Sequence, residues 1–245
     1  YVKMRETQKD EMFREYPSTS GESFLAALKG SFYGVQMAQV RKEKRICGVP
    51  YDPRIPVNTA WDLGYGNLTS IIFHQRVGRE NRIIDYFQDH KEGFPYYVRM
   101  LAERRYVYGN FYLPHDIGVG ELGTGVSRLE TLRSLMPTAN LIVVPKLDIS
   151  DGREAVRNLL PTCWFDQKRT DDTLVKALEW YQREWDEDLG GFKSKHLEDW
   201  ACHPADAMRY LAIGLGYYPA ASGPIQPDGK SGEKWKRRKR SAMAV

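Results

Sequence analysis

Apolar residues recur with two different periods along the middle of the chain, and together these periods predict a layered α/β domain. Runs that are rich in β-branched and aromatic residues, and are bounded by turn residues, predict strands. Gly78 lies between the second and third of these runs and indicates a hairpin loop at 77–81. The continuous apolar run 141–144 is typical of a buried parallel strand. The predicted strands are 59–63, 68–75, 82–87, 110–115 and 141–144.

Helical spacing of apolar residues predicts helices between and after these strands. The longest, 170–188, would place Leu174, Leu178, Tyr181 and Trp185 on one apolar stripe. The predicted helices are 23–40, 94–105, 124–136, 151–160, 170–188 and 204–215. Three antiparallel strands followed by two helix–strand units describe a mixed five-stranded sheet with helices on both faces. This α/β order is that of the ribonuclease H-like architecture.

The composition changes at both ends of the chain. Residues 1–50 are rich in charge and include the turn-forming stretch 16–22, so we expect a connector there. Residues 51–218 contain most of the predicted elements and form the expected globular domain. Residues 219–245 are rich in proline, glycine and charge, which indicates a flexible basic tail.

Positive charge is concentrated in this tail. The whole chain carries +4, and seven Lys/Arg against two Asp/Glu at 221–245 give +5, which leaves −1 for the rest. Such a tail could contact phosphates or an acidic protein surface, and a solvated terminus is the alternative. The candidate contact residues are Lys236, Arg237, Arg238, Lys239 and Arg240.

Composition and spacing also argue against several other classes of protein. Apolar residues make up 42% of the chain, but no run approaches the ~18 residues of a membrane span. The three cysteines are far apart, fit no zinc-binding spacing and favour a reducing compartment. Residues 223–231 resemble a P-loop, but the spacing between the two glycines is one residue too long and two prolines interrupt it.

Three aspartates lie at the ends of predicted elements. Asp62 lies on the first strand, Asp116 ends the fourth, and Asp206 lies in the first turn of the last helix. Aspartate is a poor strand former and is rarely buried unpaired, so these positions point to a function. If the carboxylates converge, they could bind a pair of divalent cations for phosphodiester hydrolysis. Ordinary alternatives stay open: a turn after Asp62, an Asx turn after Asp116, and a helix-dipole effect or an ion pair with Arg209 for Asp206.

The motifs around these aspartates resemble one known family. They are Trp61-Asp-Leu-Gly64 with Thr69, Leu113-Pro-His-Asp116, and His203-Pro-Ala-Asp-Ala-Met-Arg-Tyr-Leu211. In order and spacing they resemble the C-terminal nuclease domain of the large terminase subunit of tailed double-stranded DNA bacteriophages. The resemblance spans roughly residues 57–217. Asn67 is a departure, because relatives often carry aspartate there, and it argues against a further carboxylate.

This resemblance implies a ribonuclease H-like nuclease domain at 51–218, whose substrate is concatemeric viral DNA. It implies that Asp62, Asp116 and Asp206 are the catalytic, metal-binding residues, with two Mg²⁺ or Mn²⁺ ions as cofactors. It also implies double-stranded DNA, the portal protein and the small terminase subunit as partners, action in the host cytoplasm, and a packaging ATPase ahead of the connector.

Three further residues are candidates for supporting roles. His115 and His203 neighbour two of the aspartates and could orient a carboxylate or contact a phosphate, although a buried and satisfied histidine is the more ordinary reading. Glu121 lies in a glycine-rich stretch and could belong to a loop over the site.

Two other functions remain open. The basic tail would also suit a DNA- or portal-binding module of a packaging motor without significant cleavage of its own. Asp62-x-Gly-x-x-x-x-Thr69 resembles the first phosphate-binding turn of sugar-kinase and actin-like ATPases. Those proteins need a second such turn, and the sequence offers no match for it.

Overall fold

The computed structural model describes residues 30–64, 68–120, 123, 125–188 and 190–218. A seven-stranded sheet in the order β1-β7-β4-β3-β2-β5-β6 forms its centre. Its strands are β1 Ile46–Cys47, β2 Val57–Asp62, β3 Leu68–Val77, β4 Glu80–His90, β5 Tyr108–Leu113, β6 Asn140–Val143 and β7 Cys163–Asp166. Strands β2, β3 and β4 are antiparallel neighbours, and β5 and β6 follow β2 in parallel. These five strands confirm the predicted mixed sheet.

The sheet is two strands wider than predicted. Strand β7 pairs in parallel with the start of β4, through Asn81 and Cys163, and β1 pairs in parallel with β7. Neither segment is among the strands predicted from the sequence. Both strands are short, and each pairs with a strand far away in the sequence. Periodicity within a short window therefore carried no signal for them.

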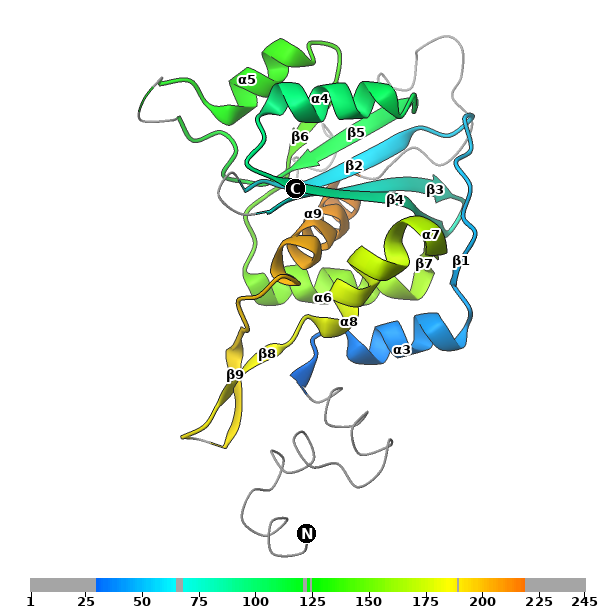
Figure 1. Ribbon diagram of the computed structural model, residues 1–245, viewed down its shortest axis with the longest axis vertical. Coiled ribbons are helices and arrows are strands. Elements are labelled where there is room, and N and C mark those ends of the chain that lie inside the picture. The colour runs from blue at the N-terminus through cyan, green and yellow to red at the C-terminus, as the bar shows by residue number, and fades with distance from the viewer. Residues whose placement is uncertain (1–29, 65–67, 121–122, 124, 189, 219–245) are drawn as a thin grey trace, which may run out of the picture.

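Helices cover both faces of the sheet, as Figure 1 shows. Helices α4 Phe94–Glu103 and α5 Arg128–Leu135 lie on one face. Helices α3 Gly34–Lys42, α6 Ile149–Leu159, α8 Lys176–Trp180 and α9 Cys202–Tyr217 lie on the other. Neighbouring residues of a strand point to opposite faces, so Ile71 and Phe73 join the α4 core while Ile72 joins the α9 core. Among the described residues, no helix is both long and apolar enough to cross a bilayer.

Part of the segment that was expected to be a connector packs into this domain. Phe32, Tyr33, Met37 and Val40 are buried in the same core as α9. Burial of such a face stabilises the fold, because apolar side chains leave water. Residues 30–50 are therefore part of the packed domain. Residues 1–29 and the predicted tail 219–245 lie outside the described residues.

The long helix predicted at 170–188 is wrong in its second half. The apolar stripe is buried as far as Tyr181, but the helix ends at Trp180 and the chain then forms a separate β-hairpin. Trp185 lies on the hairpin, where its ring packs edge-on against Phe192 at a centroid distance of 4.8 Å. Gly190 adopts φ +57° in the turn, a conformation that favours glycine. The segments are α7 Gln167–Thr170, a π-helical turn Asp171–Val175, α8, β8 Arg183–Asp186 and β9 Gly191–His196.

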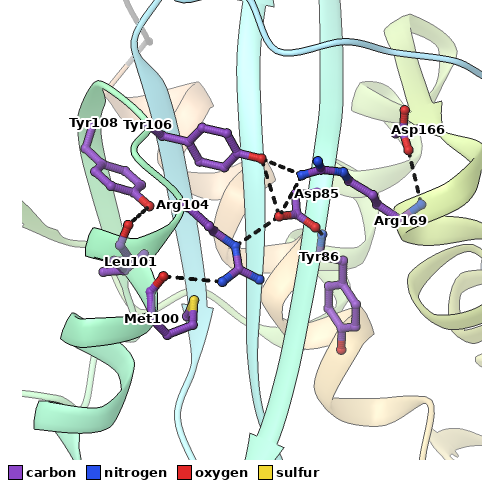
Figure 2. Close-up of polar contacts among 9 residues, drawn as sticks. All are labelled: Asp85, Tyr86, Met100, Leu101, Arg104, Tyr106, Tyr108, Asp166 and Arg169. Carbon is purple, nitrogen blue, oxygen red and sulfur yellow. Dashed lines mark hydrogen bonds and ion pairs between the residues drawn. The ribbon is translucent and has the colours of Figure 1, made fainter.

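A buried carboxylate joins three elements on the α4 face of the sheet (Figure 2). Asp85 on β4 is 7% exposed, and its Oδ2 accepts from Nε of Arg104 at 3.0 Å and from Nη1 of Arg169 at 3.3 Å. Tyr106 donates its hydroxyl to the same oxygen and receives a hydrogen bond from Arg169. The backbone N–H of Tyr86 donates to Oδ1. One side chain therefore ties β4 to the segment after α4 and to α7.

A second buried polar group lies on β3. His74 is fully buried, and its Nδ1 accepts from Nδ2 of Asn58 at 3.5 Å. Its Nε2–H donates to Oδ1 of Asn81 at 2.9 Å. This pairing selects the neutral imidazole with its proton on Nε2. Burial lowers the pKa of His74 from 6.5 to about 4.

We expect His74 to make the domain less stable in mild acid. The imidazole takes up a proton near pH 6.5 in the unfolded chain but only near pH 4 in the folded chain. The contribution of the neutral His74 to the free energy of unfolding is therefore fully present above pH 6.5 and is lost as the pH falls towards 4. Between about pH 7 and about pH 5, the loss from this residue is about 2 kcal/mol. Urea unfolding at both pH values should show that the free energy of unfolding falls less between about pH 7 and about pH 5 for His74→Gln than for the unchanged chain. His90→Gln, which alters an exposed histidine, should leave the drop as it is, and an equal drop in all three proteins would refute the assignment.

Candidate active site

Two of the three aspartates reach the same edge of the sheet. Strands β2 and β5 are parallel neighbours, with Ala60 opposite Tyr112. Asp62 is the last residue of β2, and Asp116 comes three positions after the end of β5. The carboxyl ends of parallel neighbours meet at one edge, where ligands of open α/β sheets bind. The side chain of Asp62 is 15% exposed, whereas Asp116 lies in an exposed turn.

Helix α9 brings the third aspartate to this edge. It packs across β2, β3 and β5. Gly214 allows the close approach, because a Cβ there would clash with the ring of Tyr112. Asp206 is half-buried near the start of the helix, and Tyr210 follows one turn later. Burial raises the pKa of Tyr210 to about 12, and the charges of Asp62, Asp206 and Asp116 all add to that rise. The charges of all three carboxylates therefore act on this phenol, and the charge of Arg209 opposes them.

His203 holds Asp62 in place. Its Nδ1 lies 2.9 Å from Oδ2 of Asp62, although the two residues are far apart in the sequence. Burial raises the pKa of Asp62 and the charge of Asp206 raises it further, while the hydrogen bond from His203 opposes both. The same hydrogen bond raises the pKa of His203. A proton shared along this contact offsets part of the cost of burying the carboxylate.

Asp206 forms an ion pair with Arg209, one of the alternatives that the sequence left open. The Nε and Nη2 atoms of Arg209 both lie 3.0 Å from Oδ1 of Asp206. The side chain of Arg209 is only 11% exposed, and that of Asp206 is 30% exposed. Asp206 is thus turned towards an internal cation and Asp62 towards a histidine.

These orientations explain why no preformed metal cluster is present among the described side chains. In that part of the chain, no three His, Cys, Asp or Glu side chains surround one point closely enough to hold a metal ion. The donor set nevertheless fits Mg²⁺ or Mn²⁺, which prefer carboxylate oxygens. A cation between Asp62 and Asp206 would also relieve the repulsion that raises the pKa of Asp62.

The remaining predicted residues contribute less to the described site. His115 is half-buried beside Asp116. Glu121 and Asn67 lie outside the described residues, as do the tail residues 236–240. Their predicted roles therefore stay predictions.

A cavity of about 700 Å³ opens beside the carboxylate edge on the α4 face. Leu63 and Gly64, which directly follow Asp62, line it, and so do Val119 and Gly120, three and four residues after Asp116. Arg128 at the start of α5 adds a positive charge. The sequence analysis gave Arg128 no role, because one basic residue at a helix start carries no specific signal. The lining also includes Thr69, Phe94, Tyr97 and the acidic Glu92.

No protein-family model and no curated protein matches the chain at a significant level, but solved structures do. The large terminase of a thermophilic bacteriophage with ATP-gamma-S matches at TM-score 0.56 and 15% identity, over 76% of this chain and 45% of that one. The P22 large terminase nuclease domain matches at TM-score 0.51 and 16% identity, over 71% of this chain and 90% of that domain. The SPP1 large terminase nuclease domain with bound Mn matches at TM-score 0.50 and 18% identity, over 67% of this chain and 88% of that domain.

These likenesses concern the fold, because every identity is low. The chain has the mixed, ribonuclease H-like α/β fold of large terminase nuclease domains, as the resemblance in its motifs predicted. It spans less than half the length of the large terminase from the thermophilic bacteriophage, whereas it covers most of the P22 and SPP1 nuclease domains.

Proposed function

We propose that this chain is the nuclease part of a large terminase subunit and cleaves double-stranded DNA during the packaging of a viral genome. The observation that carries this proposal is the placement of the three aspartates: Asp62 and Asp116 follow parallel neighbouring strands, and His203, three residues before Asp206 on α9, contacts Asp62 at 2.9 Å. The SPP1 nuclease domain, which has the same fold, was solved with bound Mn, and this supports a divalent metal as cofactor.

The proposed roles follow from the contacts of each carboxylate. Asp62, held by His203, supplies a fixed oxygen at the centre of the site. Asp206 presents its Oδ2 from α9, because Arg209 engages Oδ1. Asp116 approaches from the neighbouring strand end and is exposed enough to meet a substrate phosphate. Two Mg²⁺ or Mn²⁺ ions held by these oxygens would activate a water and stabilise the leaving oxygen of a phosphodiester.

The substrate path would pass over the carboxylate edge towards the cavity on the α4 face. A strand whose scissile phosphate lies between Asp62 and Asp116 would extend towards Arg128, because the cavity wall includes Gly64, two positions after Asp62, and Val119, three positions after Asp116. The basic tail would add sequence-independent attraction to DNA. Binding to the portal protein and the small terminase subunit, and action in the host cytoplasm, are further parts of the proposal that derive from the resemblance.

Arg128 is expected to contribute one phosphate contact. Arg128→Ala should weaken binding of duplex DNA to a similar degree for all sequences and lower the slope of log K against log salt by about 1. Fluorescence anisotropy at several salt concentrations in EDTA measures the slope without cleavage. Arg133→Ala on the same helix is the matched control, because Arg133 does not line the cavity. Equal slopes for the unchanged chain and Arg128→Ala would exclude the contact.

The function itself is tested with supercoiled plasmid and purified protein. We expect nicked and linear products in Mg²⁺ or Mn²⁺ and none in EDTA. A folded protein that binds DNA but leaves the plasmid intact in both metals would contradict the nuclease proposal. It would favour the alternative that the charge of the tail suggests, a DNA- or portal-binding module of the packaging motor.

A further inference from the structure

Arg209 is a largely buried cation that contacts one of the proposed metal ligands, Asp206. Its side chain is 11% exposed, and both of its contacts with Asp206 go to Oδ1 at 3.0 Å. Burial works against the charged form, but the neighbouring Asp206 keeps the pKa of Arg209 above its ordinary value. The charge of Arg209 also reaches Asp62, whose pKa it lowers. Arg209 therefore directly offsets the negative charge of Asp206.

The side chain of Arg209 packs closely against a glycine of helix α6. Gly152 on α6 lies against it, and a Cβ at that position would come within 2.7 Å of Cγ and 2.5 Å of Cδ of Arg209. The guanidinium also lies 4.8 Å from the ring centroid of Tyr210. Helix α6 thus fixes the aliphatic part of the side chain, and Tyr210 and Asp206 on α9 fix the guanidinium. The position of the charge is set by packing, unlike that of an exposed surface arginine.

We propose that Arg209 is a resident counter-cation, a positioning residue that holds Asp206 while no metal is bound and then opposes metal binding through its charge. The inference rests on the proposed function, since it concerns the same carboxylates. A buried acidic cluster without a cation is costly, so the guanidinium keeps the site assembled. A divalent ion held by the same carboxylates would be repelled by the guanidinium. Arg209 therefore weakens metal binding while it stabilises the empty site.

Two substitutions separate the charge of Arg209 from its shape. Arg209→Gln keeps a hydrogen-bond donor but removes the charge, and it should bind Mn²⁺ about tenfold more tightly, which corresponds to ~1.4 kcal/mol. Arg209→Lys keeps the charge and should bind Mn²⁺ within about threefold of the unchanged chain. Isothermal titration calorimetry with Mn²⁺ measures both affinities. An affinity of Arg209→Gln equal to or below that of the unchanged chain overturns the inference.

Thermal unfolding provides a second readout. Without metal, Arg209→Gln should melt at a lower temperature than the unchanged chain, and saturating Mn²⁺ should raise its melting temperature by the larger amount. An equal rise in both proteins counts against a counter-cation. A purely structural arginine would lower the melting temperature of the variant without increasing its affinity for Mn²⁺.

The unchanged chain itself allows a test that does not depend on variants. The Nε–H resonance of Arg209 should shift as Mg²⁺ is added, because its bond to Asp206 loosens. Mg²⁺ binding without any shift of that resonance overturns the inference and leaves the proposed nuclease intact. If calorimetry detects no binding of Mn²⁺ by the unchanged chain, the proposed nuclease site and this inference both fail.

Discussion

Asp62→Asn is expected to reduce metal-dependent DNA cleavage by about a thousandfold, or ~4 kcal/mol of transition-state stabilisation. The amide has nearly the same shape as the carboxylate and can still accept a hydrogen bond from His203, which lies 2.9 Å from Asp62. The substitution therefore removes the negative charge and little else. Plasmid cleavage in Mg²⁺ or Mn²⁺ at a fixed protein concentration measures the loss.

The same substitution should not reduce stability. Burial and the charge of Asp206 raise the pKa of Asp62, so the fold disfavours the ionised carboxylate at neutral pH. A neutral side chain relieves that cost, and we expect the free energy of unfolding of Asp62→Asn to equal or exceed that of the unchanged chain. A residue that lowers stability but is needed for activity is typical of a functional site.

The matched control is Asp52→Asn, which alters an aspartate paired with exposed Arg54 at the surface. It should cleave DNA at the rate of the unchanged chain. Asp62→Asn is a sharper test than a substitution of Asp206, because loss of Asp206 would leave Arg209 buried without its partner. Cleavage by Asp62→Asn at the unchanged rate would remove Asp62 from the proposed mechanism.

The central strands could be predicted because their signals are local. Strands β3 and β4 are long, rich in β-branched and aromatic residues, and joined by a tight turn at Gly78. Helix α9 begins within two residues of its predicted start, and Pro204 lies in its first turn. By contrast, β1 and β7 are short and depend on partners far away in the sequence. The pattern at 170–188 also fits a helix, and the hairpin is selected by contacts with residues after it, such as the packing of Trp185 on Phe192 and the ion pair of Lys193 with Glu184.

The site could be predicted in outline but not in its contacts. Element order placed Asp62 and Asp116 near one sheet edge, because parallel neighbours end together. The spacing of Asp206 and Arg209 suggested an ion pair, since residues three apart on a helix are neighbours. The contact of His203 with Asp62 joins two distant segments, and no local rule selects it over a solvent-facing histidine. The close packing of Arg209 against Gly152 likewise depends on how α6 packs against α9.

Asp85→Ala is expected to lower the free energy of unfolding by about 3 kcal/mol, because it leaves two arginines without their shared counter-charge. Arg104 is the more affected of the two. Its side chain is 20% exposed and its guanidinium carbon lies 4.8 Å from the ring centroid of Phe73. Little water can therefore hydrate the guanidinium once the carboxylate is removed. Arg169 is 53% exposed and can be solvated, which keeps the loss at the lower end of the range for buried pairs.

Urea unfolding at neutral pH measures this loss, with Asp172→Ala as the control. Asp172 pairs with Lys176 at the surface and its side chain is 91% exposed, so its removal should leave stability unchanged within error. Arg169→Ala should cost less than Asp85→Ala, because it leaves Arg104 and Tyr106 in contact with the carboxylate. The cluster shown in Figure 2 lies on the α4 face, whereas Asp62 contacts α9. Metal affinity should therefore be unaffected in any Asp85 variant that folds. A variant as stable as the unchanged chain would show that the two arginines need no buried partner.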